Sequence, residues 1–329
     1  MTRALKALAV SLAVCAAAAG SASASFPGRN GKIAYLWVGE SAYRAGPTET
    51  NIRTVDPQTH VVRVLYDCPL RTDQGVPYTD CSLSAPSWAP DGSSFAFPLV
   101  RITPNFTGQP WRFDPALGLL NPRSGSYEEH LTAHQYADVA WSPAGDRLLL
   151  TRVLPESGPS AMPGIYLASL DRTELQQIGP ALSQSPDWSS RGEIAFGHYR
   201  DRSCRPVCDE IYVTRVNGTP HRLIRGLGST PSWSPRGTKL VFARRRRSVT
   251  NIYVVRRNGH GLRRVTRRGG YNPAWSPDGK WIAFIRNGNL LVVRPNGEDA
   301  RRLVNGMSDQ SLGEGPQVVA LDWQALPRR

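Results

Sequence analysis

The sequence predicts an all-β fold: a six-bladed β-propeller in which each blade is a four-stranded antiparallel sheet. The first observation is a phrase that recurs five times in phase, as SWAPDG, AWSPAG, DWSSRG, SWSPRG and AWSPDG. The second is the spacing of its tryptophans and of the one in a final LDWQ, which lie 53, 47, 45, 42 and 48 residues apart. The third is the short apolar segment after each glycine, such as TKLVF. A period of roughly 40 to 50 residues built from short strands is typical of propeller blades.

The fifth unit shows how one repeat supplies four strands, which we expect at 231–233, 238–243, 251–257 and 261–267. Asn258-Gly259, between the third and fourth strands, is a hairpin signal because glycine adopts a positive φ at low cost. Proline, aspartate and glycine in SPDG favour a comparable turn between the first two strands. The tryptophan that heads each unit should then pack between adjacent sheets as a structural residue. These repeat tryptophans are Trp88, Trp141, Trp188, Trp233, Trp275 and Trp323.

The two ends of the chain each carry part of a sixth blade. Segments 31–37, 51–56 and 61–66 supply second, third and fourth strands without a preceding SPDG phrase, whereas 318–324 supplies a first strand with nothing after it. Pairing the terminal strands in one blade closes the ring and removes the open sheet edges between blades. We therefore expect one propeller domain over residues 25–329.

The phrase PxWSPDGxxIAF followed by IYVxxxNGxxxRxLT resembles the repeat of TolB-type propellers, the periplasmic relatives of WD-repeat proteins. The resemblance covers essentially all of residues 26–329 and implies a TolB-like six-bladed propeller. The same repeat also occurs in propellers attached to peptidases and in many exported proteins, so it describes a fold more than a function. TolB itself has an N-terminal α/β domain before its propeller, whereas here we expect the propeller to begin directly after the signal-like segment.

Residues 1–24 have the pattern of a secretory signal peptide. A basic start is followed by an apolar run and by the small residues Ala22-Ser23-Ala24, after which we expect cleavage. The apolar run is short and rich in alanine, so no membrane span is expected. Cys15 leaves a lipid anchor open as an alternative. The mature chain is predicted to be an exported monomer, located in the periplasm, in the cell envelope or outside the cell.

Four cysteines remain after cleavage, an even number in an oxidising compartment. The simplest pairing is two disulfides, Cys68 with Cys81 and Cys204 with Cys208. A metal site at CRPVC is the alternative, but no second pair or nearby histidine completes it. We therefore expect no metal and no cofactor.

The formal net charge of +14 favours acidic partners, such as an acidic protein or an anionic cell-envelope polymer. An arginine-rich composition with ordinary solvated faces explains the charge equally well. An exported protein has little occasion to meet nucleic acid, so no nucleic-acid partner is expected.

Within a blade, the links from second to third strand and from fourth strand to the next blade emerge on one face, which we call the long-loop face. Those links look long and different in every blade, while the SPDG and NG turns of the opposite face look short and uniform. Binding residues tend to lie on irregular loops of a rigid scaffold. Arginines and aromatic residues are common interface anchors. The predicted binding residues are Arg245, Arg246, Arg247, Arg267, Arg268, Trp111, Arg112, Tyr199 and Arg200.

Catalytic motifs are scarce. The chain has no GxSxG elbow for a serine hydrolase, and most of its six histidines fall at strand ends or turns in different blades. No catalytic residue is predicted. The sequence thus favours a noncatalytic binding or scaffold propeller, with a carbohydrate-active lyase or hydrolase in the central funnel as the alternative. Convergence of several His, Asp, Glu or Tyr side chains at the channel mouth would favour the enzyme.

Overall fold

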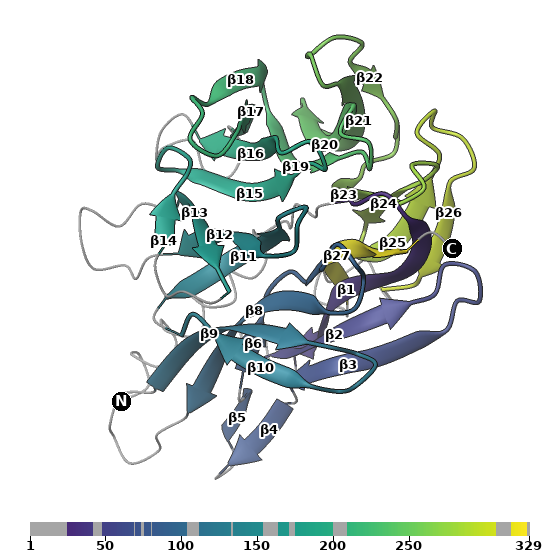
Figure 1. Cartoon of the computed structure of the whole chain (residues 1–329). Helices are drawn as coiled ribbons and strands as arrows, with labels where there is room; N and C mark the ends of the chain where they lie inside the picture. Colours follow the sequence, from purple (N-terminus) through teal and green to yellow (C-terminus); the bar gives the residue numbers. More distant parts are fainter. Residues whose placement is uncertain are drawn as a thin grey trace.

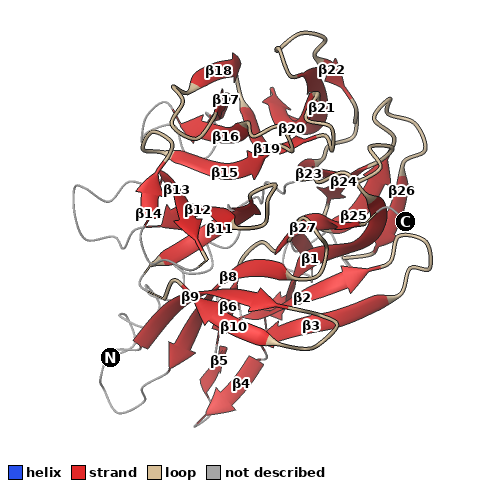
Figure 2. Ribbon diagram, in the orientation of Figure 1, coloured by secondary structure: helices blue, strands red, loops and turns tan. Residues whose placement is uncertain are grey.

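Six sheets arranged in a ring make up the protein (Figure 1). The computed structural model describes residues 25–41, 48–68, 70–73, 76–79, 81–103, 112–132, 134–153, 164–170, 175–199, 209–306 and 317–327. Within those ranges every regular element is a strand and none is a helix (Figure 2). The predicted fold class, a six-bladed propeller whose blades are four-stranded antiparallel sheets, is confirmed. Among these described residues there is accordingly no helix long and apolar enough to span a membrane.

Blade one contains both ends of the chain, in the spatial order β27 (Gln317–Leu326), β1 (Arg29–Ser41), β2 (Thr48–Val55) and β3 (Val62–Cys68). Blade two contains β6 (Cys81–Leu83), β7 (Ser87–Trp88), β8 (Phe95–Thr103), β9 (Arg112–Leu120) and β10 (Tyr127–His130). Blade three contains β11 (Gln135–Trp141), β12 (Arg147–Val153), β13 (Gly164–Ser169) and β14 (Leu175–Gln177).

Blade four contains β15 (Ser183–Trp188), β16 (Ile194–Tyr199), β17 (Asp209–Thr214) and β18 (His221–Ile224). Blade five contains β19 (Gly228–Trp233), β20 (Lys239–Arg246), β21 (Val249–Arg256) and β22 (Arg263–Arg264). Blade six contains β23 (Tyr271–Trp275), β24 (Ile282–Arg286), β25 (Asn289–Val293) and β26 (Arg301–Val304).

Blade one closes the ring as predicted, because β27 pairs antiparallel with β1. Gln324 reinforces this closure through both the oxygen and the nitrogen of its side-chain amide. Its Oε1 accepts a hydrogen bond from the Lys32 N–H at 3.0 Å, and its Nε2 donates to the Gly92 carbonyl at 2.7 Å. The Ser25 hydroxyl donates to the Trp275 carbonyl at 2.6 Å and so joins the N-terminal end to blade six. Side chains as well as strand pairing therefore hold the two ends in place.

The repeat tryptophans lie between neighbouring sheets, where none exposes more than a few per cent of its surface. Trp88 packs with Phe95 and Phe97 in a cluster shared by blades one and two, and Trp233 packs with Phe242 in another. Burial of a large aromatic side chain contributes on the order of 2 to 3 kcal/mol to stability, and here it recurs at every blade. The repeated phrase thus supplies the core of the ring.

The structure differs from the sequence-based expectation in the link into blade two, in the first strand of blade two, and in the links of blades five and six. The segment inside the Cys68–Cys81 loop, for which no strands were expected, forms a hairpin of β4 (Leu70–Asp73) and β5 (Val76–Thr79). The first strand of blade two is broken into β6 and β7, which both pair with β8. The expectation that the second-to-third-strand link is long in every blade is wrong for blades five and six. Register pairs Arg246 with Val249 and Arg286 with Asn289, so each link there is a two-residue turn.

Candidate functional site

A group of arginines lies where β20 meets β21, at the predicted long-loop face of blade five. Both strands are eight residues long, and the tight turn between them places Arg245, Arg246 and Arg247 at the exposed tip of the hairpin. Arg247 has a φ of 55°, which a two-residue hairpin turn needs and a residue other than glycine seldom adopts. The hairpin therefore presents consecutive cations on a short, well-defined support.

Arg244 does not join this group. Its Nη2 donates to the Arg225 carbonyl at 3.1 Å, and its guanidinium lies 5.8 Å from the centre of the Tyr253 ring. The side chain therefore lies along the blade.

The link between β22 and β23 brings Arg267 and Arg268 beside the hairpin. The Gly270 N–H donates to the Thr250 carbonyl at 3.0 Å, and the Gly269 N–H donates to the Asn251 side-chain oxygen at 3.0 Å. Both acceptors lie at the start of β21, next to the arginine turn. Arg267 and Arg268 are exposed. We refer to Arg245, Arg246, Arg247, Arg267 and Arg268 as the basic cluster.

Arg286, at the end of β24, is a sixth cation that the sequence did not single out. Its Nε donates to the Gly269 carbonyl at 3.2 Å, which fixes it beside the link that carries Arg268. Burial lowers the pKa of Arg286, and the positive charge of Arg268 lowers it further. Arg286 and Arg268 therefore lie close enough for their positive charges to interact.

The charge around the basic cluster is strongly one-sided. Residues 211–297 contain 18 lysines and arginines and a single acidic residue, Asp278, whereas the rest of the chain contains 22 basic and 25 acidic residues. No arginine of the basic cluster forms an ion pair with a carboxylate in the described part of the chain. The positive charge of the protein is concentrated most strongly from the end of blade four through blade five, because residues 211–270 contain 15 lysines and arginines and no acidic residue. This segregation distinguishes the surface from an evenly arginine-rich one.

The remaining predicted binding residues do not form a second cluster. Arg112 is exposed, and its Nε lies 2.8 Å from an oxygen of Asp114. Tyr199 is buried, with 7% of its surface exposed, and its N–H donates to the Leu182 carbonyl at 3.0 Å. Trp111 and Arg200 lie outside the described residues.

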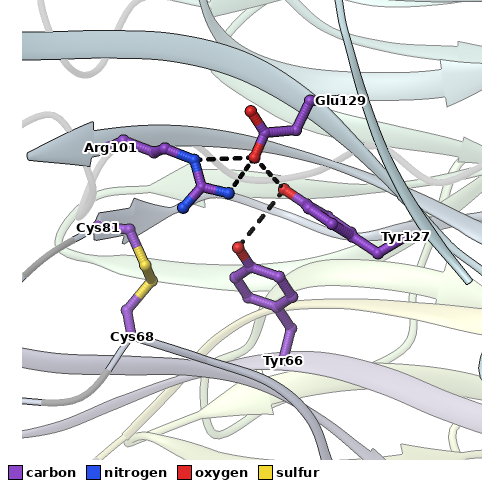
Figure 3. The surroundings of a disulfide bond; sticks show 6 residues. All are labelled: Tyr66, Cys68, Cys81, Arg101, Tyr127 and Glu129. Atoms are coloured by element: carbon purple, nitrogen blue, oxygen red, sulfur yellow. Dashed lines mark hydrogen bonds and ion pairs between the residues drawn. A yellow bond between two sulfur atoms is a disulfide. The ribbon is translucent and has the colours of Figure 1, made fainter. Parts of the chain in front are cut away.

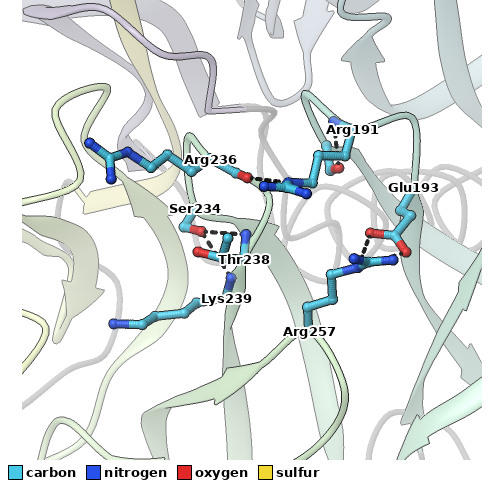
Figure 4. A network of polar contacts seen from close by, with 8 residues as sticks. Arg191, Glu193, Ser234, Arg236, Thr238, Lys239 and Arg257 are labelled. Atoms are coloured by element: carbon cyan, nitrogen blue, oxygen red, sulfur yellow. Dashed lines mark hydrogen bonds and ion pairs between the residues drawn. The ribbon is translucent and has the colours of Figure 1, made fainter.

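The opposite face of blades four and five also carries cations, but some of these are paired. Arg257 forms an ion pair with the largely buried Glu193, with Nε 2.8 Å from the carboxylate, and the Arg191 Nε donates to the Arg236 carbonyl at 2.7 Å. The side chains of Arg236 and Lys239 extend away from this ion pair (Figure 4). They offer exposed cations on a different face, which are useful as charge-matched controls.

The disulfide between Cys68 and Cys81 joins the end of β3 to the start of β6 and encloses the β4–β5 hairpin (Figure 3). Beside it the Arg101 Nε donates to Glu129 at 2.9 Å, and the Tyr127 hydroxyl donates to the same carboxylate at 2.7 Å. Burial opposes ionisation of Glu129, but the two donors outweigh it and lower the pKa of its carboxyl. The Tyr66 hydroxyl of blade one donates to the Tyr127 hydroxyl at 3.4 Å, so this contact and the disulfide join blades one and two. The predicted Cys204–Cys208 pair lies outside the described residues.

Three buried aspartates lie in innermost strands and connect adjacent blades. Asp138 accepts from the Ser185 N–H at 3.0 Å, Asp322 accepts from the Trp88 N–H at 2.6 Å, and Asp187 accepts from the Trp233 N–H. Burial raises the pKa of Asp138 to about 6. Burial also raises the pKa of Asp187 well above its usual range, and the charge of Asp322 adds to that rise.

These carboxylates accept backbone hydrogen bonds from the neighbouring blade. This structural role is enough to explain why they are buried in the inner strands. No group of three or more His, Cys, Asp or Glu residues suited to hold a metal ion occurs among the residues that the structure describes. The described inner strands therefore supply inter-blade contacts.

A cavity of about 340 Å³ lies between blades one and two on the face of the short turns. Its lining includes Lys32, Arg63 and Arg123 together with Asp56 and Leu65. The N–H groups of Thr59 and Gln58 donate to Asp56 and, with the charge of Lys32, lower its pKa against the small effect of burial. The cavity therefore holds three cations and one ionised carboxylate. Sequence patterns do not predict this cavity, because its lining residues come from separate strands and turns.

Comparison with known proteins agrees with the geometry. Residues 179–310 match the family model described as the TolB beta propeller domain. A protein named TolB homolog from Chlorobium luteolum is 32% identical over 174 residues, which are 49% of this chain and 38% of that relative. The chain thus matches well under half the length of this curated relative.

Solved structures extend the likeness over most of the chain. TolB from Acinetobacter baumannii has a TM-score of 0.65 at 17% identity, covering 91% of this chain and 68% of that one. A putative TolB from Agrobacterium tumefaciens has a TM-score of 0.58 at 17% identity, covering 89% and 99%. A chain of a nidogen/laminin complex has a TM-score of 0.62 at 8% identity, covering 90% and 100%. At these identities the likeness shows the fold, and the chain is a TolB-like six-bladed propeller.

Proposed function

We propose that this chain is an exported, noncatalytic binding propeller whose basic cluster recognises an anionic partner, either an acidic protein surface or an anionic cell-envelope polymer. In this proposal residues 1–24 are removed on export, and residues 25–329 act as one monomeric propeller domain. The pattern of residues 1–24 and the likeness to TolB propellers support a location in the periplasm, in the cell envelope or outside the cell.

The observation that carries the proposal is the segregation of charge over residues 211–297, combined with the exposure of the basic cluster. Arginine side chains that have no acidic partner among the described residues can offer guanidinium donors to carboxylates or phosphates, which they can bind in a bidentate manner. A surface of one sign also raises the local concentration of oppositely charged partners and speeds their association. The two-residue turn adds rigidity, so little backbone entropy is lost on binding.

A pull-down from cell-envelope extract with the mature protein tests this function. The variant replaces the five arginines of the basic cluster by glutamine. The control makes the same change in charge on the opposite face, by glutamine substitution at Arg215, Arg236, Lys239, Arg256 and Lys280, which are exposed. We expect partners to be captured by the wild type and by the control but lost by the basic-cluster variant.

Equal capture by all three proteins would place the binding surface elsewhere on the ring. If the wild type captured no partner, the binding proposal itself would fail. Circular dichroism of both variants checks that the blades are intact, because all ten substituted side chains are exposed and lie outside the core.

A further inference from the structure

The outermost strand of blade one differs from the other outer strands in length and in the character of its surface. β3 is seven residues long, and β2 pairs with one of its edges while no described strand pairs with the other. It lies at the outer rim of the ring (Figure 1). Val61, Val62 and Val64 are 53%, 42% and 53% exposed. A long exposed strand edge with apolar side chains is a template for pairing with another chain.

The outer strands of the other blades carry polar or charged side chains. β10 has Glu128, β14 has Gln176, and β18 has His221 and Arg222. β22 and β26 each begin with two exposed arginines. Such residues discourage edge-to-edge pairing. Among the described outer strands, β3 alone exposes valines along its edge.

Register shows which β3 backbone groups are directed outward. The Asp56 N–H donates to the Val61 carbonyl at 3.1 Å, so residue 61 bonds toward β2. Inward and outward bonding alternate along an antiparallel strand. Arg63, opposite Thr54, therefore bonds inward, and the N–H and C=O groups of Val62 and Val64 are directed away from β2.

The two faces of β3 differ chemically. Arg63 lies opposite Thr54, and both line the cavity of about 340 Å³ between blades one and two, together with Lys32 and Arg123. Val62 lies opposite Val55, whose side chain packs in the cluster shared with blade six, on the other face. A strand added to this edge would thus meet a cationic cavity on one face and two valines on the other.

We propose that β3 binds an extended segment of a partner protein as an added strand, with an acidic residue opposite Arg63 and apolar residues on either side of it. Side chains alternate between faces along a strand, so the acidic side chain points to the face of Lys32, Arg63 and Arg123. Its two neighbours then lie against Val62 and Val64. Main-chain hydrogen bonds supply affinity, and the alternation of apolar and acidic side chains supplies specificity.

Fluorescence anisotropy with a labelled, capped peptide of sequence STVEVTS tests the proposal, and STVQVTS and STVKVTS serve as comparisons. We expect the glutamate peptide to bind most tightly and the lysine peptide most weakly. Arg63→Glu should change the ratio of those two affinities by about tenfold in favour of lysine, because like charges directly opposite each other are unfavourable. Arg264→Glu, on the outer strand β22, is the matched control and should leave the ratio unchanged.

Two variants test pairing at the edge. Val64→Pro removes an outward N–H that makes no bond to β2, and proline is tolerated on edge strands in that setting. The double variant Val62→Lys with Val64→Lys keeps the backbone and removes the apolar contacts. Both should abolish peptide binding while the thermal unfolding midpoint stays close to that of the wild type.

Equal affinity for the glutamate and glutamine peptides would overturn the acidic position. Binding that survives both edge variants, or no binding of any peptide, would overturn the docking site. The wild type could instead bind no peptide but self-associate in sedimentation experiments, and the double lysine variant could abolish that self-association. This result would show that the occupant of the edge is a second copy of this chain and not a partner segment. The basic-cluster variant should bind STVEVTS as the wild type does, so failure of the proposed function and failure of this inference are separable.

Discussion

Replacing Asp138 by asparagine removes an ionisable group from the innermost strand of blade three. The carboxylate is fully buried, accepts a hydrogen bond from the Ser185 N–H, and has a pKa of about 6. The ordinary pKa of an aspartate is 3.8, so the pKa of Asp138 is about two pH units higher in the folded protein than in the unfolded chain. The folded state therefore binds more protons, and this residue's contribution to stability falls as pH rises from about 4 to about 6.

The size of this effect follows from the shift. One pKa unit corresponds to about 1.4 kcal/mol, so ionisation of buried Asp138 costs about 2 to 3 kcal/mol at neutral pH. Asparagine keeps an acceptor for the Ser185 N–H and carries no charge at any pH. Its amide adds a cost of its own, on the order of 1 to 3 kcal/mol, if a buried N–H lacks a partner. That cost is independent of pH and does not affect the test.

The assay is urea unfolding of wild type and Asp138→Asn at pH values between about 4 and 8, with the difference in free energy of unfolding plotted against pH. We expect the variant to gain about 2 to 3 kcal/mol relative to the wild type over that range. Asp114→Asn, at an aspartate whose side chain is 43% exposed and pairs with the exposed Arg112, is the control and should change far less. A difference for Asp138→Asn that does not vary with pH would refute the reasoning.

Three further perturbations have expected outcomes. Gly92→Ala should lower the unfolding midpoint, because Gly92 has a φ of 67° and a Cβ would clash with the Ala325 carbonyl at the closure; Gly125→Ala, at a similar φ with open space around it, is the milder control. Trp233→Ala should cost about 3 to 5 kcal/mol in urea unfolding, and a cost below 1 kcal/mol would contradict the core role. Replacing Cys68 and Cys81 by serine should cost about 3 kcal/mol in the same assay and loosen the β4–β5 hairpin before the blades in hydrogen exchange, whereas uniform protection would contradict that order.

Much of the ring could be predicted from the sequence because its signals are local and repeated. A tryptophan, a tight turn and an apolar strand recur in phase, and each places its own side chains without reference to distant residues. The pairing of β27 with β1 followed from counting which strands were missing at each end. Repetition turns weak local preferences into a specific architecture.

Most of the features that were missed depend on contacts between segments or on weak turn signals, although the two-residue turn of blade six carries a plain Asn287-Gly288 signal. The turn at Arg247 lacks the glycine or asparagine that usually marks a two-residue hairpin, so its link was expected to be longer. Arg286 joins the basic cluster through the Gly269 carbonyl of the preceding link, which sequence spacing does not show. The segregation of charge over residues 211–297, in contrast, is a property of the sequence, and a charge count along the chain would have found it.

The most direct test of the central claim is a titration of the mature protein with poly-glutamate at low and moderate salt, comparing the wild type, the basic-cluster variant and the charge-matched control. Both variants lose the same number of positive charges, so a difference between them reports where those charges lie. The account predicts salt-sensitive binding by the wild type and the control and at least tenfold weaker binding by the basic-cluster variant at low salt. Equal loss in the two variants would show that net charge alone attracts the polymer, and it would contradict a defined binding surface at the β20–β21 hairpin.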